Sequence, residues 1–182
     1  MILKSIDGPK SSFYKGVGIL LIVIHNFMIL VKDTPGHNEF DFDPERFQLL
    51  IRTLQEAPEE VFRLIPTYLG HFGVHIFIFL SAYGLTKKYL HAPPNFLPFI
   101  KSRVKKLYLP FLLAVVGWMV ITTLFKGPTI GGEIIFSALD SILFKLLLIS
   151  PFMAEHSLYP EGPWWFIPFI MQFYLIFPLM IR

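Results

Sequence analysis

The chain has 182 residues, of which 54% are hydrophobic and only 16% are charged, with 20 phenylalanines and a formal net charge of +3. Soluble domains have about 45 to 50% apolar residues, so this composition excludes an ordinary water-soluble fold. The sequence contains no cysteine, which excludes disulfide frameworks and thiolate metal sites. The apolar residues cluster into runs close to the roughly 20 residues that cross a bilayer core, and these runs predict transmembrane helices.

The first apolar run covers residues 16–31 and predicts a membrane-spanning helix. The segment before it contains three lysines and one acidic residue, and this balance places the N-terminus on the cytoplasmic side. A cleavable signal peptide would show a small-residue cleavage site after the run, whereas a long polar segment follows here. That segment, residues 33–68, contains eight acidic side chains and an amphipathic helical pattern. We therefore expect it to be an extracytoplasmic loop.

Two further apolar runs flank a strongly basic segment. The run at residues 69–86 predicts a second span, and residues 87–106 then contain six Lys or Arg side chains and no acid. Because basic residues collect on the cytoplasmic side of membrane proteins, we expect a cytoplasmic loop there. The third run, at residues 107–125, returns outward with Pro110 close to its start, where proline is tolerated.

Residues 134–153 are ambiguous because one side of the expected helix is polar. Ser137, Ser141 and Lys145 recur every four residues, which puts them in one stripe. We interpret the segment as an interfacial helix that lies on the membrane surface. A span here would force the following loop, which is acidic and has no Lys or Arg, to the cytoplasmic side against the charge rule.

The last run begins at the aromatic pair Trp164 and Trp165, residue types that favour the membrane–water interface, and it ends at Arg182. The sequence thus predicts an all-α fold: a polytopic transmembrane helix bundle with about four spans, one interfacial helix and both termini in the cytoplasm. Residues 1–182 show no internal repeat or linker, so we expect a single membrane domain. The chain stops directly after an apolar run, which predicts a fragment of a larger bundle.

His25 is the main candidate for chemistry. It lies nine residues past Gly16, and therefore roughly 13 Å into the membrane at about 1.5 Å per residue. Ionisable groups at such depth are rare and usually functional. A neutral imidazole can take a proton from a hydroxyl group near neutral pH. The alternative, a histidine that only bonds a neighbouring helix or a backbone carbonyl, fits this position equally well.

A second candidate is the basic cluster of Arg103, Lys105 and Lys106 at the start of the third span. These side chains present several donors suited to phosphate on the cytoplasmic side, where they could hold a nucleotide-like carrier. The alternative is that they only fix the topology of the chain.

Other polar residues in the apolar runs allow weaker hypotheses. His71 and His75 share one helix face, but no carboxylate accompanies them at the spacing of zinc proteases, so we predict no metal site and expect packing or substrate contact. We interpret Ser81 as a serine bonded to its own helix. No glycine-rich phosphate loop or nucleic-acid module occurs, so we expect no nucleic-acid partner.

Four short motifs follow one another along the chain: KGVGILLIVIH from Lys15 to His25, GVHIFIFLSAYGL from Gly73 to Leu85, FIKSRVKKLYLPFLL at residues 99–113, and WFIPFIMQFYLIFP from Trp165 to Pro178. In this order they resemble the acyltransferase-3 family of bacterial integral membrane O-acyltransferases, over most of residues 10–182. The family has a basic residue, a glycine and an apolar run ending in histidine, then a GV-x-LFFVLSG helix, a basic stretch before a proline-bearing helix, and a W…QFYL..P helix.

The resemblance implies a cell-membrane enzyme that moves an acyl group from acyl-CoA, its co-substrate, to a hydroxyl group. Acetyl-CoA is the expected donor, and a surface glycan or lipid-linked molecule is the expected acceptor. Direct transfer of this kind needs no metal. By resemblance, His25 is the catalytic base, the donor-binding residues are Lys15, Arg103 and Lys106, and the substrate-binding residues are His75 and Trp165.

The chain departs from the family pattern at several positions. Lys15 is one residue closer to the histidine than usual, so Asn26 is an alternative for the last position of the first motif. His75 replaces a common acid, and Ile170 and Met171 stand where many members have glutamates. These last changes suggest a divergent subfamily or weakened activity.

Two other functions remain alternatives at this stage. In a transporter or channel subunit, His25 and the pair His71 and His75 would line a polar pathway through the membrane. A non-catalytic membrane scaffold would show neither transport nor consumption of acyl-CoA.

Overall fold

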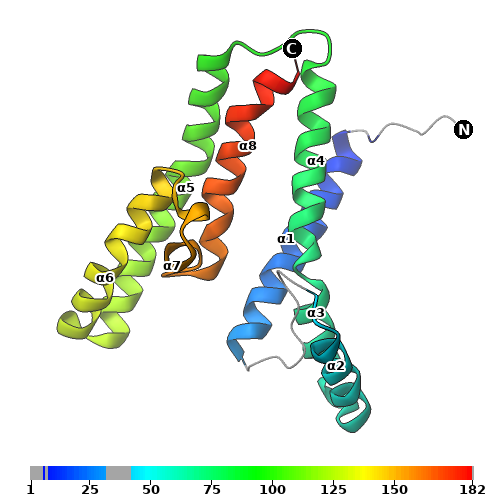
Figure 1. Cartoon of the computed structure of the whole chain (residues 1–182), viewed down its shortest axis with the longest axis vertical. Helices are drawn as coiled ribbons and strands as arrows, with labels where there is room; N and C mark the ends of the chain where they lie inside the picture. Colours follow the sequence, from blue (N-terminus) through cyan, green and yellow to red (C-terminus); the bar gives the residue numbers. More distant parts are fainter. Residues whose placement is uncertain (1–5, 7, 32–41, 182) are drawn as a thin grey trace, which may run out of the picture. The chain divides into compact units, whose positions relative to one another are not determined.

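A computed structural model describes residues 6, 8–31 and 42–181. Within these ranges every regular element is an α-helix or a short 3-10 helix, and no β-strand occurs. Four helical segments are long and apolar enough to cross a membrane: Gly8–Val31, Pro58–Tyr89, Phe96–Lys126 and Gly162–Met180 (Figure 1). The predicted all-α transmembrane bundle is therefore confirmed.

The chain divides into two compact units, Met1–Lys88 and Tyr89–Arg182, and each is described by itself. The helices that begin in the first unit are α1 (Gly8–Val31), α2 (Pro44–Glu56), η1 (Pro58–Glu60), α3 (Val61–Leu69) and α4 (Phe72–Tyr89). The second unit contains α5 (Phe96–Lys126), α6 (Pro128–Leu146), η2 (Ser150–Phe152), α7 (Ala154–Ser157), η3 (Gly162–Trp165) and α8 (Phe166–Met180). The single membrane domain expected over residues 1–182 stays a prediction.

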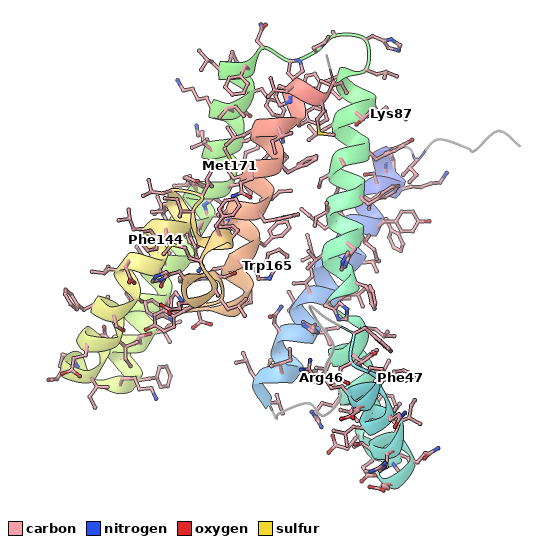
Figure 2. All side chains as sticks on the ribbon, in the orientation of Figure 1. Arg46, Phe47, Lys87, Phe144, Trp165 and Met171 are labelled. Carbon is pink, nitrogen blue, oxygen red and sulfur yellow. The ribbon has the colours of Figure 1, made fainter. Side chains whose placement is uncertain are left out.

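Helix α2 confirms the amphipathic helix expected within residues 33–68. The carboxylate of Asp43 accepts a hydrogen bond from the backbone N–H of Glu45 at 2.9 Å and caps the helix start, and Pro44 occupies the first turn. Leu50 is buried, whereas Phe47 remains exposed (Figure 2). The part of this predicted loop at residues 33–41 lies outside the described residues.

The second candidate span begins at Pro58, earlier than the apolar run at residues 69–86 indicates. Helices α3 and α4 are separated only by the turn at Gly70 and His71, so the apolar α3 extends the segment. Residues 58–68, which their acidic neighbours assigned to the outer loop, therefore belong to a candidate span. Glu59 and Glu60 lie in its first turn, where negative charge is favourable.

Helix α1 packs against α3, and Gly70 allows the two to approach closely. A Cβ atom at Gly70 would lie 2.5 Å from the Cβ of His25 and 2.7 Å from the backbone oxygen of Leu21. No larger side chain fits there without displacing α1. This close approach brings the end of α3 against the part of α1 that contains His25.

The basic segment at residues 87–106 is mostly helical rather than a loop. Helix α4 continues to Tyr89 and α5 begins at Phe96, so only residues 90–95 interrupt the helices. Pro93 and Pro94 explain the interruption, because proline cannot continue a preceding helix. The cluster of basic side chains from Lys101 onward therefore projects from the first turns of α5.

In the second unit, α5 and α6 form a helical hairpin. Gly127 makes the turn with a φ of 78°, a conformation that glycine adopts without strain. The hairpin core consists of Phe111, Val115, Ala138 and Ile142, with Trp164 packed against it. The helix expected at residues 134–153 is α6, which begins earlier, at Pro128, and ends at Leu146.

Candidate active site

His25 is buried, with 3% of its surface exposed, on the face of α1 that meets α3. Its Nδ1 atom lies 2.6 Å from the backbone oxygen of Thr67. A carbonyl can only accept, so in a neutral imidazole Nδ1 carries the proton and donates it. The Nε2 atom then retains a lone pair that can accept a proton from a substrate. This is the tautomer that a general base requires.

The carbonyl of Thr67 is open to His25 because α3 ends two residues later. The last carbonyls of a helix have no partner within it, and the backbone N–H of Gly70 bonds to the oxygen of Pro66 at 2.7 Å instead. The hydroxyl of Thr67 donates to the oxygen of Arg63 at 2.6 Å. The imidazole thus supplies a donor to one carbonyl of this helix end, and that carbonyl in turn orients the ring.

His71 lies beside His25, and His75 lies beside His71. The ring centre of His71 is 5.8 Å from that of His25 and 6.4 Å from that of His75. His71 is buried, whereas His75 is exposed at the start of α4. The row leads from a buried ring to an accessible one. Within the described ranges, no group of three or more His, Asp or Glu side chains is arranged to hold a metal ion.

The remaining candidates on α1 lie apart from the imidazole. Lys15 is ten residues before His25, and therefore about 15 Å away along the helix. Asn26 donates a hydrogen bond to the oxygen of Ile22, at 2.8 Å, on its own helix. The structure therefore brings neither side chain to the ring of His25.

Arg103 is held between two aromatic rings in the second unit. Its guanidinium carbon lies 4.9 Å from the ring centre of Phe99 and 5.1 Å from that of Tyr174, distances typical of cation–π contacts. Its Nε atom is buried and has no hydrogen-bond partner in the part of the chain that the structure describes. Lys106, one helical turn further along α5, is exposed. Together they present one cation oriented by aromatic rings and one exposed cation.

Trp165 lies at the start of α8, as the interfacial aromatic pair predicts (Figure 2). It packs against Phe166 and Phe169, with ring centres 6.0 and 5.7 Å away. Ile170 and Met171, at the positions of the family's glutamates, have 0% and 2% of their surface exposed. This part of α8 is an apolar core face, so it supplies no carboxylate.

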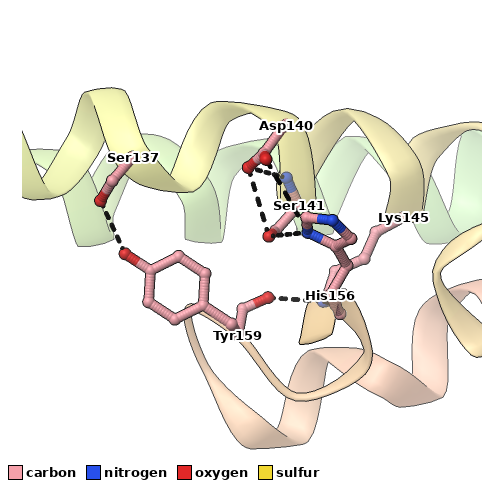
Figure 3. Close-up of polar contacts among 6 residues, drawn as sticks. All are labelled: Ser137, Asp140, Ser141, Lys145, His156 and Tyr159. Atoms are coloured by element: carbon pink, nitrogen blue, oxygen red, sulfur yellow. Dashed lines mark hydrogen bonds and ion pairs between the residues drawn. The ribbon is translucent and has the colours of Figure 1, made fainter. Parts of the chain in front are cut away.

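Sequence reasoning missed a polar cluster between α6 and the chain that follows it (Figure 3). Ser141 Oγ lies 2.7 Å from His156 Nδ1, and Ser137 Oγ lies 2.8 Å from the hydroxyl of Tyr159. The ammonium of Lys145 donates to the backbone oxygens of His156, at 2.5 Å, and Tyr159, at 2.7 Å. The stripe of polar residues was visible in the sequence. Its partner was not, because residues 150–161 show no helical periodicity to place them.

Helical structure throughout the described ranges, four candidate spans and an imidazole oriented by a helix end fit the class of polytopic membrane transferases. The family model of acyltransferase-3, described as an acyltransferase domain, matches residues 12–182. The chain therefore belongs to this family and is an acyltransferase, which confirms the resemblance and favours an enzyme over a transporter or scaffold. No curated protein and no solved structure matches the chain.

Proposed function

We propose that the protein is an O-acyltransferase that moves an acyl group, most simply acetyl, from acyl-CoA to a hydroxyl group of a glycan or lipid-linked acceptor. His25 is the general base. The observation that supports this role most directly is the 2.6 Å contact between His25 Nδ1 and the oxygen of Thr67, because it places the proton of a neutral imidazole on Nδ1 and the lone pair on Nε2. The family match supports acyl transfer in general.

In the proposed reaction, Nε2 of His25 removes the proton of the acceptor hydroxyl as its oxygen attacks the thioester carbonyl. The new ester bond forms and the bond to the CoA sulfur breaks. The imidazolium then returns its proton to the thiolate, which leaves as free CoA. General base catalysis contributes about 10² to 10⁴-fold, so the site must add proximity and exclusion of water.

The donor site of the proposal consists of Arg103 and Lys106, with Lys15 as a further candidate. The two rings that flank Arg103 fix its guanidinium plane, so less conformational freedom is lost when it binds a phosphate. Guanidinium groups bind phosphate oxygens in pairs, which suits the pyrophosphate of CoA. His75 and Trp165 are the proposed substrate contacts, because one is an exposed imidazole and the other a half-buried aromatic ring.

The proposed orientation in the cell membrane places both termini and the basic segment at residues 87–106 in the cytoplasm. This arrangement follows the distribution of basic side chains and lets acyl-CoA reach Arg103 from the cytoplasm. The acceptor then approaches from the outer side.

The test is transfer of label from radioactive acetyl-CoA in membranes that contain the full-length protein. The account expects alkali-labile label on a polymer or lipid fraction, together with release of free CoA. A matched sample with His25→Asn should show neither. Movement of a solute without consumption of acetyl-CoA would support the transporter alternative instead.

A further inference from the structure

Helix α6 is not among the candidate spans, yet it does not lie across the end of the unit as an interfacial helix would. It runs alongside α5, and its core residue Ile142 packs with Phe111 (Figure 1). The hydroxyl of Tyr108, in the first half of α5, donates to the oxygen of Leu146 at 2.8 Å. The C-terminal end of α6 therefore lies well inside the length of α5.

A second contact shows which part of α8 lies beside the end of α6. The side-chain amide of Gln172 donates to the backbone oxygen of Leu148 at 2.9 Å. Gln172 is ten residues past Gly162, where the last candidate span begins, which is about 15 Å along a helix. A bilayer core is about 30 Å thick, so this level is near the middle of the span formed by α8.

The chain reaches the depth of Gln172 from one end of the unit and then returns toward the same end. It enters from Lys126 through α6, and it returns through η2 and α7 to the start of α8. There the indole N–H of Trp118 donates to the carboxylate of Glu161 at 2.9 Å, and the rings of Trp118 and Trp164 are 5.9 Å apart. Trp118 lies eight residues before the end of α5, so the start of α8 lies beside the second half of α5. The start of α8 and Gly127 are therefore on the same side of the Tyr108 level, and the intervening chain goes in and comes back.

The returning chain, residues 147–161, contains only the short helices η2 and α7, so part of its backbone needs other hydrogen-bond partners at this depth, because lipid provides none. The polar stripe of α6 provides them. Lys145 has 0% of its surface exposed and donates to two carbonyls of the returning chain, while Ser141 bonds the side chain of His156 (Figure 3). A buried ammonium is costly unless it is bonded in this way.

We propose that residues 128–161 form a re-entrant hairpin, which enters the membrane from the side of Gly127, turns at residues 147–152 and returns to the same side, and that Lys145 is the positioning residue that holds its returning arm. The stripe of α6 then faces this arm rather than the lipid headgroups. The turn of the hairpin thereby places non-helical backbone, including the oxygen of Leu148, beside Gln172 near the middle of the span formed by α8. Its existence does not depend on the proposed catalytic role of His25.

Residues 1–182 contain no cysteine, so each cysteine introduced below is the single labelling site of this part of the protein. The exposed residues Glu133 and Lys101 mark the two ends of the second unit, and the exposed Leu147 marks the tip of the hairpin. We expect an impermeant maleimide to label Glu133→Cys and Lys101→Cys from opposite sides of the membrane, and Leu147→Cys from neither side. A bimane group at position 147 should be quenched by nitroxides in the middle of the acyl chains. Headgroup-level quenching, or labelling from the side of Glu133, would show an interfacial helix. Labelling of Leu147→Cys from the side of Lys101 would show a full span.

The role of Lys145 is tested with a cysteine at Ser150, which is fully buried in the turn that leads into the returning arm. We expect slow labelling of Ser150→Cys by a small thiol reagent, and labelling about tenfold faster or more when Lys145→Met is added, because two buried carbonyls lose a charged donor. The matched control is Lys126→Met, which removes an exposed lysine at the end of α5 and should leave the rate unchanged. Equal rates in the two variants would overturn the positioning role, and the tip labelling tests the hairpin without either variant.

Discussion

Replacing His25 by asparagine separates the proposed catalytic role from a structural one. The amide nitrogen of asparagine lies near the position of imidazole Nδ1, so it can still donate to the oxygen of Thr67, which His25 contacts at 2.6 Å. Asparagine cannot accept a proton near neutral pH. The variant therefore keeps the bond between α1 and α3 and loses only the base.

The two roles predict effects of different size. Hydrogen bonds between membrane helices contribute about 0.6 kcal/mol on average, and leaving a buried carbonyl without a partner costs about 1 to 3 kcal/mol. Loss of a general base costs about 10² to 10⁴-fold in rate, or about 2.7 to 5.4 kcal/mol in activation free energy. Catalysis thus predicts that His25→Asn lowers turnover at least about 100-fold while the thermal midpoint stays near that of the parent.

The assay measures CoA thiol release by the full-length protein and its thermal unfolding in detergent. His25→Ala should lose both activity and stability, and His25→Gln should lose activity, because glutamine is also no base. The reasoning would be refuted by a His25→Asn protein with near-parental turnover. In that case the ring only bridges α1 and α3, and the chemistry belongs to another group.

Three further predictions address packing, donor binding and topology. Gly70→Ala should lower the free energy of unfolding by about 1 to 3 kcal/mol, because its Cβ would lie 2.5 Å from the backbone oxygen of Pro66. The control is Gly84→Ala, which has nothing within 4 Å of its Cβ and should unfold like the parent protein. The double variant of Arg103→Gln and Lys106→Gln should raise the KM for acyl-CoA more than it lowers kcat, since phosphate binding persists through the reaction; an unchanged KM would exclude the donor site. A cysteine at Lys88 should resist an impermeant reagent added outside intact cells, and labelling there would reverse the proposed orientation.

The four spans could be predicted from the sequence because run length and composition suffice to identify a membrane helix. The extent of the second span could not. Glu59 and Glu60 indicated an outer loop, yet they lie in a helical turn that leads directly into the apolar α3. Similarly, the density of basic residues at 87–106 indicated a loop, although only the segment around Pro93 and Pro94 is non-helical. The density of charged residues therefore does not determine the local conformation.

The candidate site was predictable in part. The depth of His25 in an apolar run marked it as unusual, but its partner, the oxygen of Thr67, is 42 residues away in sequence and is a backbone atom that no motif identifies. The partner of Lys145 was hidden for the same reason, since both of its acceptors are backbone oxygens. Side-chain patterns show which groups need partners, whereas only the fold shows which carbonyls meet that need.

The most direct test of acyl transfer is the fate of label from acetyl-CoA in membranes with the full-length protein and with its His25→Asn variant. The account predicts an alkali-labile acetyl ester on an acceptor and an equal amount of free CoA with the parent protein, and at least about 100-fold less of both with the variant. Equal ester formation by the two proteins would contradict the assignment of His25, and no ester from the parent protein would contradict the proposed O-acyl transfer itself.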